Sequence, residues 1–171
     1  MKENVTVIKE GGKSIVLIND ILFKSRKQID WDTVEEMLKH YVGECVEIIE
    51  TADKIYIGTD FPDEFAHSND TINTKGANEK AKANVANAIR EIVRTASDRM
   101  FSDDYQNKHG NAAKEGWYRY TTRFGIPVYD SEGQIERYNI FTAKMLVRKN
   151  ADGRLYLYDL VRTKKESVQP A

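Results

Sequence analysis

The segment GWYRYTTRFGIPVYD, residues 116–130, carries the residue types that most directly suggest a chemistry. If residues 117–124 form a strand, their side chains alternate between two faces. One face then carries an indole and two guanidinium groups: Trp117, Arg119, Thr121 and Arg123. The other face is typical of a protein core: Tyr118, Tyr120, Thr122 and Phe124. Arginine binds phosphate through parallel hydrogen bonds and tryptophan stacks on unpaired bases, so the first face predicts contacts with RNA.

A proton carrier for this face has to be one of three histidines, His40, His67 and His109. His40 ends a predicted helix, where its ring suits the free carbonyl groups. His67 and His109 lie in polar segments, and His109 shortly precedes the strand that bears the arginines. Because imidazole titrates near neutral pH, we expect His109 to donate or accept a proton.

Together these groups suffice to cleave RNA without a metal ion. A base removes the proton of a ribose 2′-hydroxyl, whose oxygen attacks the adjacent phosphorus, and an acid protonates the leaving 5′ oxygen. In this hypothesis Arg119 and Arg123 hold the phosphate and Trp117 is a stacking platform. The alternative is structural: Trp117 is half buried, and the arginines pair with Glu115 or Glu136.

Other chemistries have no signature in the chain. The motifs of phosphate-binding loops, dinucleotide-binding folds, zinc proteases and α/β-hydrolases are absent. Histidines and carboxylates show no metal-ligand spacing, so we expect neither a metal nor a cofactor. The single cysteine, Cys45, excludes an intrachain disulfide, and its surroundings, GECVEIIE, predict a buried position.

Length and composition indicate one globular domain. The chain has 171 residues, of which 40% are hydrophobic and 31% are charged, an ordinary balance for a folded domain. No apolar run is long enough to cross a bilayer, and the first residues, MKENVTVIKEGG, lack the apolar stretch of a signal peptide. We therefore expect no membrane partner and a cytoplasmic location.

Charge is distributed unevenly along the chain. Residues 1–98 contain 13 basic and 18 acidic side chains, whereas residues 99–171 contain 13 and 9. Residues 44–70 alone hold eight acids against Lys54. Such a distribution can steer a polyanion to one surface or present an acidic patch to a basic protein, and it also fits two solvated surfaces without a partner.

The elements that must position these residues follow from local patterns. Gly11-Gly12 between two β-rich runs predicts a hairpin, and residues 30–43 predict a helix with Asp32 and Glu35 as a capping box. A second hairpin turns at residues 51–53, residues 59–74 read as an irregular loop, and residues 76–100 read as the longest helix. Strands at about 117–128, 135–148 and 155–163 complete the chain.

The fold class expected is α+β: an N-terminal β-hairpin, two main helices, then a three- to four-stranded antiparallel meander. We expect residues 1–22 to form a hairpin appendage that leads into a single domain of residues 23–171. Lysines and an arginine within residues 1–27 could bind the phosphate backbone of RNA. The candidates are Lys2, Lys9, Lys13, Lys24, Arg26 and Lys27.

Several stretches resemble a known family. FPDEF, KGANEKAKANVANAI, WYRYTTRFGIPVYD and ERYNIFTAKMLVRKNADGRLYLYDLVRTKKE are similar to a domain carried by phages and conjugative elements, which belongs to the barnase–EndoU–colicin–RelE-like assemblage of small RNases. The resemblance covers residues 14–166, although no catalytic Glu/His pair can be matched. With its added hairpin, the chain also resembles the small anti-CRISPR proteins of streptococcal mobile elements.

The resemblance implies a function and its partners. An anti-CRISPR protein of this kind promotes truncation of the guide RNA of a type II CRISPR effector nuclease inside a bacterial host. The alternative is a non-catalytic inhibitor whose acidic surface, residues 44–70, occupies a basic nucleic-acid channel of the effector. A third reading is a toxin-like fold kept only for protein interaction. Only the enzyme shortens RNA.

Overall fold

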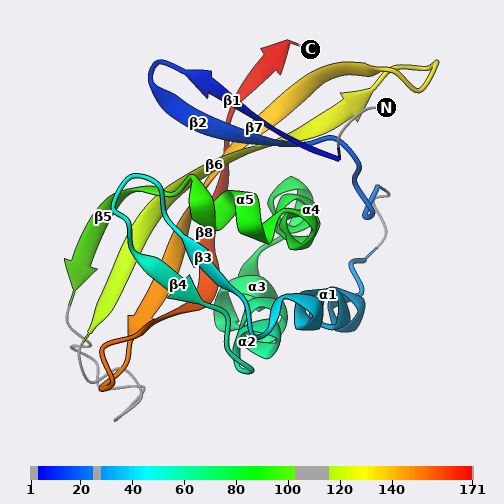
Figure 1. Ribbon diagram of the computed structural model, residues 1–171. Coiled ribbons are helices and arrows are strands. Elements are labelled where there is room, and N and C mark those ends of the chain that lie inside the picture. The colour runs from blue at the N-terminus through cyan, green and yellow to red at the C-terminus, as the bar shows by residue number, and fades with distance from the viewer. Residues whose placement is uncertain (1–3, 25–27, 103–115, 171) are drawn as a thin grey trace.

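The computed structural model describes residues 4–24, 28–102 and 116–170 (Figure 1). Strands and helices alternate in the first part of the chain, and three long strands end it. The strands are β1 Val5–Glu10, β2 Lys13–Ile18, β3 Cys45–Glu47, β4 Lys54–Tyr56, β5 Ser97–Ser102, β6 Trp117–Tyr129, β7 Ile135–Lys149 and β8 Leu155–Pro170. The α-helices are α1 Trp31–Leu38, α2 Phe61–His67, α3 Asn69–Asn73, α4 Gly76–Asn84 and α5 Ile89–Arg94, with 3₁₀ turns η1 Lys39–Tyr41 and η2 Val85–Asn87.

All strands belong to one curled sheet, which the helices cover on one side (Figure 1). The strand order is β1-β2-β6-β7-β8-β4-β3, and β5 pairs with β6 beside β2. The predicted meander is matched in part: β6, β7 and β8 are consecutive antiparallel neighbours, but they belong to a larger sheet that further strands join. Two parallel pairs, β2 with β6 and β4 with β8, attach the hairpins to this meander.

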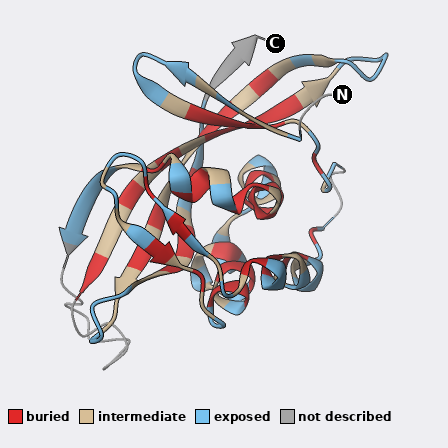
Figure 2. Ribbon diagram, viewed as in Figure 1, coloured by how far each residue is buried: buried red, intermediate tan, exposed pale blue. Residues whose placement is uncertain are grey.

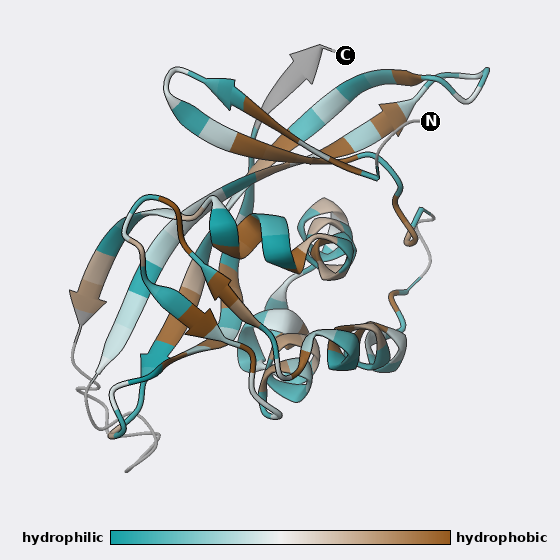
Figure 3. Ribbon diagram, in the orientation of Figure 1, coloured by the Kyte–Doolittle hydropathy of each residue, from teal (hydrophilic) through white to brown (hydrophobic). Residues whose placement is uncertain are grey.

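The core lies between the sheet and the helices (Figures 2 and 3). On β6 the side chains of Tyr120 and Phe124 point into it, as the alternation of residues 117–124 predicts. A smaller apolar cluster of Ile15, Leu17, Tyr138 and Ile140 forms separately from this core. The mixed α+β class expected from the sequence is therefore confirmed.

The N-terminal hairpin is part of the sheet rather than separate from it. Gly11 and Gly12 turn with φ of 60° and 81°, as predicted for a two-residue turn. Residues 15–18 of β2 are all buried and contribute to both apolar clusters. At Gly125, where β6 passes β2, an added Cβ atom would lie 2.7 Å from Leu17 Cδ2 and 3.2 Å from Ile140 Cδ1, so a larger residue would have to displace these side-chain ends. Residues 1–22 thus supply an internal strand, β2, and an edge strand, β1.

The long helix predicted over residues 76–100 is wrong. The chain leaves helical geometry at Ala88, whose φ is −142°, and enters β5 at Ser97. Shortly before this break, the Asn84 amide oxygen accepts hydrogen bonds from the backbone N–H groups of Leu22 and Phe23, and its amide nitrogen donates to the Phe23 carbonyl. The apolar periodicity of residues 76–100 cannot indicate hydrogen bonds to residues so distant in the sequence.

The irregular loop predicted over residues 59–74 is also wrong, because α2 and α3 lie there. Pro62 occupies the first turn of α2, a position where proline loses no helical hydrogen bond. Ser68 caps α3, and its hydroxyl accepts a hydrogen bond from the N–H of Thr71. Both are helix-start signals that the polar composition of the segment obscures.

Two smaller expectations also need correction. The cap of α1 is Asp30, whose carboxylate accepts hydrogen bonds from the N–H groups of Asp32 and Thr33, so no capping box starts at Asp32. Cys45 is exposed rather than buried, since it lies on the solvent side of β3. Among the residues that the structure describes, no helix is long and apolar enough to cross a bilayer.

A buried cation joins the helices to the sheet. The Lys82 ammonium on α4 has 0% exposure and lies 2.9 Å from an Asp70 oxygen and 3.0 Å from an Asp159 oxygen. Asp159, on β8, is 2% exposed, and this burial raises its pKa to about 6, although the nearby ammonium opposes the shift. Asp159 therefore binds a proton more tightly in the folded than in the unfolded chain.

This raised pKa predicts how stability changes with pH. An unfolded aspartate titrates near pH 3.9, so the Asp159 contribution to the free energy of unfolding should fall by about 2 to 3 kcal/mol as pH rises from 4 to 7. Urea denaturation of the parent protein and of Asp159→Asn, at pH 4 and pH 7, measures this contribution as the difference between the two proteins. Parallel pH profiles would contradict it.

Candidate functional site

The outward face of β6 differs from the predicted RNA platform at Trp117. The indole is only 6% exposed and packs edge-on against the Tyr158 ring, with 4.9 Å between ring centroids. A base cannot stack on a ring with this exposure unless neighbouring groups move. Trp117 thus contributes to packing at the end of the β6–β7–β8 sheet.

The two arginines of this strand are half buried, and one has carboxylate partners. The Arg123 guanidinium pairs with Glu166 on β8 and lies 3.6 Å from a Glu10 oxygen at the tip of the hairpin. Neither partner is the predicted Glu136, and the predicted Glu115 lies outside the residues that the structure describes. Arg119 lies beside Met100 of β5 and Leu146 of β7 in the sheet register. A phosphate clamp at Arg123 has to compete with two carboxylates.

Several predicted site residues lie outside the residues that the structure describes. These are the proposed proton carrier His109 and the RNA-binding candidates Lys2, Arg26 and Lys27. Lys24 is described and exposed, and its ammonium lies over the Tyr129 ring, 5.8 Å from the centroid. It does not line the groove that contains Lys9 and Lys13.

Lys9 and Lys13 do come together, in a groove between the hairpin and the start of β5. Its volume is about 350 Å³, and residues 94–97 form one of its walls. Arg94, the last residue of α5, adds a third cation. Ile49 and Glu50, from the turn between β3 and β4, close the groove. Sequence reasoning missed Arg94, because it placed this residue on the solvent face of one continuous helix.

The charges in the groove are partly compensated. The Lys13 ammonium lies 3.0 Å from Asp98, and this hydrogen bond holds the pKa of the Asp98 carboxyl below its usual range. The Asp98 N–H donates to a Glu50 oxygen at 2.8 Å. Lys9 and Arg94 are both exposed, and no ion pair within the described part of the chain engages either. They are therefore the cations best placed to meet an anionic ligand.

The acid-rich segment, residues 44–70, is compensated in part by cations from elsewhere in the fold. Four of its acids pair with cations from other elements, with O···N distances of 2.6–3.5 Å: Glu44 with Arg90, Asp53 with Arg99, Asp60 with Arg148, and Asp70 with Lys82. Asp53 also accepts a hydrogen bond from the Tyr120 hydroxyl. Four of the eight acids counted in this segment are thus paired with cations within the fold.

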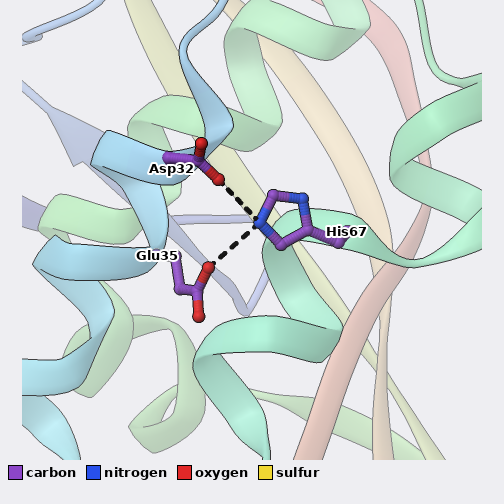
Figure 4. A group of neighbouring side chains, drawn as sticks. All are labelled: Asp32, Glu35 and His67. Atoms are coloured by element: carbon purple, nitrogen blue, oxygen red, sulfur yellow. Dashed lines mark hydrogen bonds and ion pairs between the residues drawn. The ribbon is translucent and has the colours of Figure 1, made fainter.

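A second polar cluster joins α1 to α2 (Figure 4). The Nε2 atom of His67 lies 3.0 Å from a Glu35 oxygen and 3.2 Å from an Asp32 oxygen. His67 was predicted to be a solvated loop residue, and the carboxylates were assigned to a helix cap. Glu35 and Asp32 precede His67 by 32 and 35 residues in the sequence, so no local spacing pattern indicated the cluster.

Comparisons with known proteins give no relative: no protein-family model, curated protein or solved structure matches the chain.

The packing of Trp117 predicts the effect of its removal. Trp117→Ala should lower the free energy of unfolding by about 3 to 5 kcal/mol, as expected for the loss of a buried aromatic ring. RNA affinity per folded molecule should stay within about twofold of the parent value. Urea denaturation and fluorescence anisotropy with labelled RNA measure the two quantities. Unchanged stability together with a large loss of affinity would restore the stacking role.

Proposed function

We propose that this protein binds the guide RNA of a type II CRISPR effector and promotes its truncation on behalf of a mobile element. The observation that carries the RNA-binding part is the groove that gathers Lys9, Lys13 and Arg94 from the hairpin and α5. Cations that converge on one groove from separate elements bind a phosphate backbone and release its counterions. The choice of guide RNA rests on the sequence resemblance.

The charge pairing within the fold favours RNA over the alternative partner. An inhibitor that mimics nucleic acid needs a surface with many unpaired carboxylates. In residues 44–70, however, Glu44, Asp53, Asp60 and Asp70 are held by arginines and a lysine. Releasing them to a partner would break these ion pairs, so an acidic docking surface here is the weaker proposal.

The position of the groove suggests a path for the RNA. The groove ends at Ser97, the first residue of β5, and residues 103–115, which contain His109, connect β5 to β6. Six strand residues span about 20 Å. An RNA strand held in the groove and running along β5 would pass Arg119 of β6, which pairs with Met100 of β5. We propose that His109 exchanges protons with the 2′-hydroxyl or the leaving oxygen there.

Charge reversal in the groove tests the RNA-binding proposal. Lys9→Glu combined with Arg94→Glu should weaken guide-RNA binding at least tenfold, because two contacts to phosphate become repulsive. The slope of log affinity against log salt concentration should become shallower by about 1 to 2 units. Fluorescence anisotropy at four salt concentrations measures both changes.

The matched control carries the same change of charge outside the groove. Lys54→Glu combined with Lys75→Glu replaces two exposed lysines that do not line it. Its affinity should stay within about threefold of the parent value and its salt slope should not change. Equal losses in both double variants would mean that net charge, and not the groove, determines RNA binding.

Chelation tests the proposed mechanism of truncation. Attack by a 2′-hydroxyl with a histidine as proton carrier requires no divalent ion, so guide-RNA shortening should continue in EDTA. Purified protein is incubated with guide RNA, with and without the effector nuclease, and the products are resolved on a denaturing gel. Complete loss in EDTA with recovery in magnesium would exclude this mechanism, and shortening that also needs a host extract would assign cleavage to another RNase.

A further inference from the structure

We propose that Asp32, Glu35 and His67 form a binding site for a divalent transition-metal ion that joins α1 to α2. The site goes beyond the proposed action on RNA, because none of its residues lines the groove. Its three donor atoms lie within 4.8 Å of one another, and they come from two helices that pack together (Figure 4). The geometry, the charge and the ligand types each support a metal.

The local structure directs both carboxylates toward the histidine. Asp32 and Glu35 are three residues apart in the first turn of α1, so their side chains lie on the same face of the helix. Asp30 already caps this helix end, which leaves neither of them needed for capping. Lys39, one turn beyond, pairs with Glu36 and not with Glu35. His67 approaches from the last turn of α2.

The distances match those between ligands of one metal ion. Metal bonds of about 2.1 Å that meet at right angles separate two donor atoms by about 3.0 Å, and tetrahedral angles widen this to about 3.4 Å. The two oxygens lie 3.0 and 3.2 Å from His67 Nε2. Two of the three separations between donor atoms thus suit one metal ion, and the Asp32 and Glu35 oxygens lie within 4.8 Å of each other.

Charge supplies a second argument. Two carboxylates, those of Asp32 and Glu35, face a single imidazole, that of His67, so two negative charges lie close together. A divalent cation bound to neutral imidazole would balance both. Coordination would thus remove the repulsion between the Asp32 and Glu35 carboxylates, which a hydrogen bond relieves only in part.

The ligand set indicates which ions bind. Imidazole with two carboxylates suits zinc and its first-row neighbours, whereas magnesium and calcium prefer sites built from oxygen alone. Asp32 is 85% exposed and His67 is 38% exposed, so water can complete the coordination sphere. We therefore expect reversible binding of zinc, with cobalt as a spectroscopic substitute.

Metal titration of the full chain, freed of any histidine tag and of metal by chelation and dialysis, tests the site. Isothermal titration calorimetry with zinc chloride should give one site per chain. A free zinc concentration 100-fold above the dissociation constant should raise the melting temperature by about 5 to 10 °C. Cobalt chloride should produce visible absorption bands that zinc abolishes, and magnesium chloride should do neither.

Near-isosteric variants assign the ligands. Asp32→Asn, Glu35→Gln and His67→Asn should each weaken zinc binding by at least about tenfold, because loss of an outer-shell partner alone costs about 10- to 100-fold. His40→Asn and Asp63→Asn are matched controls: His40 follows α1 in η1, Asp63 lies on α2, both are exposed, and neither belongs to the cluster. The controls should bind zinc as the parent does, and circular dichroism checks the fold of every variant.

Two results would overturn the site. One is the absence of a zinc-dependent heat signal, cobalt spectrum and melting shift in the parent protein. The other is equal zinc binding by the parent and a folded Asp32→Asn or His67→Asn variant. The proposed RNA function fails by a different measurement, since guide-RNA binding by Lys9→Glu with Arg94→Glu does not involve this cluster.

Discussion

The buried ion triad of Lys82, Asp70 and Asp159 is the constraint on which the helical layer depends. A buried ammonium group needs carboxylate partners in place of the water molecules that hydrate it in solution. The ion pairs of Lys82 with Asp70 and Asp159 therefore restrict the position of α4 relative to α3 and β8. The second Asp70 oxygen accepts a hydrogen bond from the N–H of Arg162, which has a φ of 58°. This contact ties the last strand to the same centre.

With the helices held there, the sheet determines where ligand-binding surfaces form. The parallel pairing of β2 with β6 brings the hairpin beside β5, because β6 pairs with both strands along the same edge. Glycine at position 125 allows the close approach of Leu17 that this pairing needs. The groove with Lys9, Lys13 and Arg94 is a consequence of this arrangement, since no single element could form it.

The same packing explains why charge counted along the chain is a poor guide to surface charge. The acids of residues 44–70 are concentrated in sequence, yet arginines from α5, β5 and β7 approach them in space: Arg90, Arg99 and Arg148. Within acid-rich stretches, in turn, the fold places Asp32 and Glu35 of α1 beside His67 of α2. The charge that a surface presents therefore depends on which side chains the fold pairs.

The sequence by itself determined the features that depend on neighbouring residues. Alternating side chains and turn residues predicted β6, β7 and β8 nearly to their first residues, and Gly11-Gly12 predicted the first hairpin, because a turn and its two strands are close in the chain. The core face with Tyr120 and Phe124 followed from the same alternation.

Only the tertiary structure decided the features that depend on distant residues. The helix breaks at Ala88 despite the local helical periodicity, and near this break Asn84 accepts hydrogen bonds from the distant residues Leu22 and Phe23. Contacts between distant residues also account for three features of the candidate sites. These are the burial of Trp117, the pairing of Arg123 with a carboxylate, and the cluster of His67 with Asp32 and Glu35. Each of these contacts joins residues that are far apart in the sequence. Local sequence patterns carry no information about such contacts, which form only when the elements pack together.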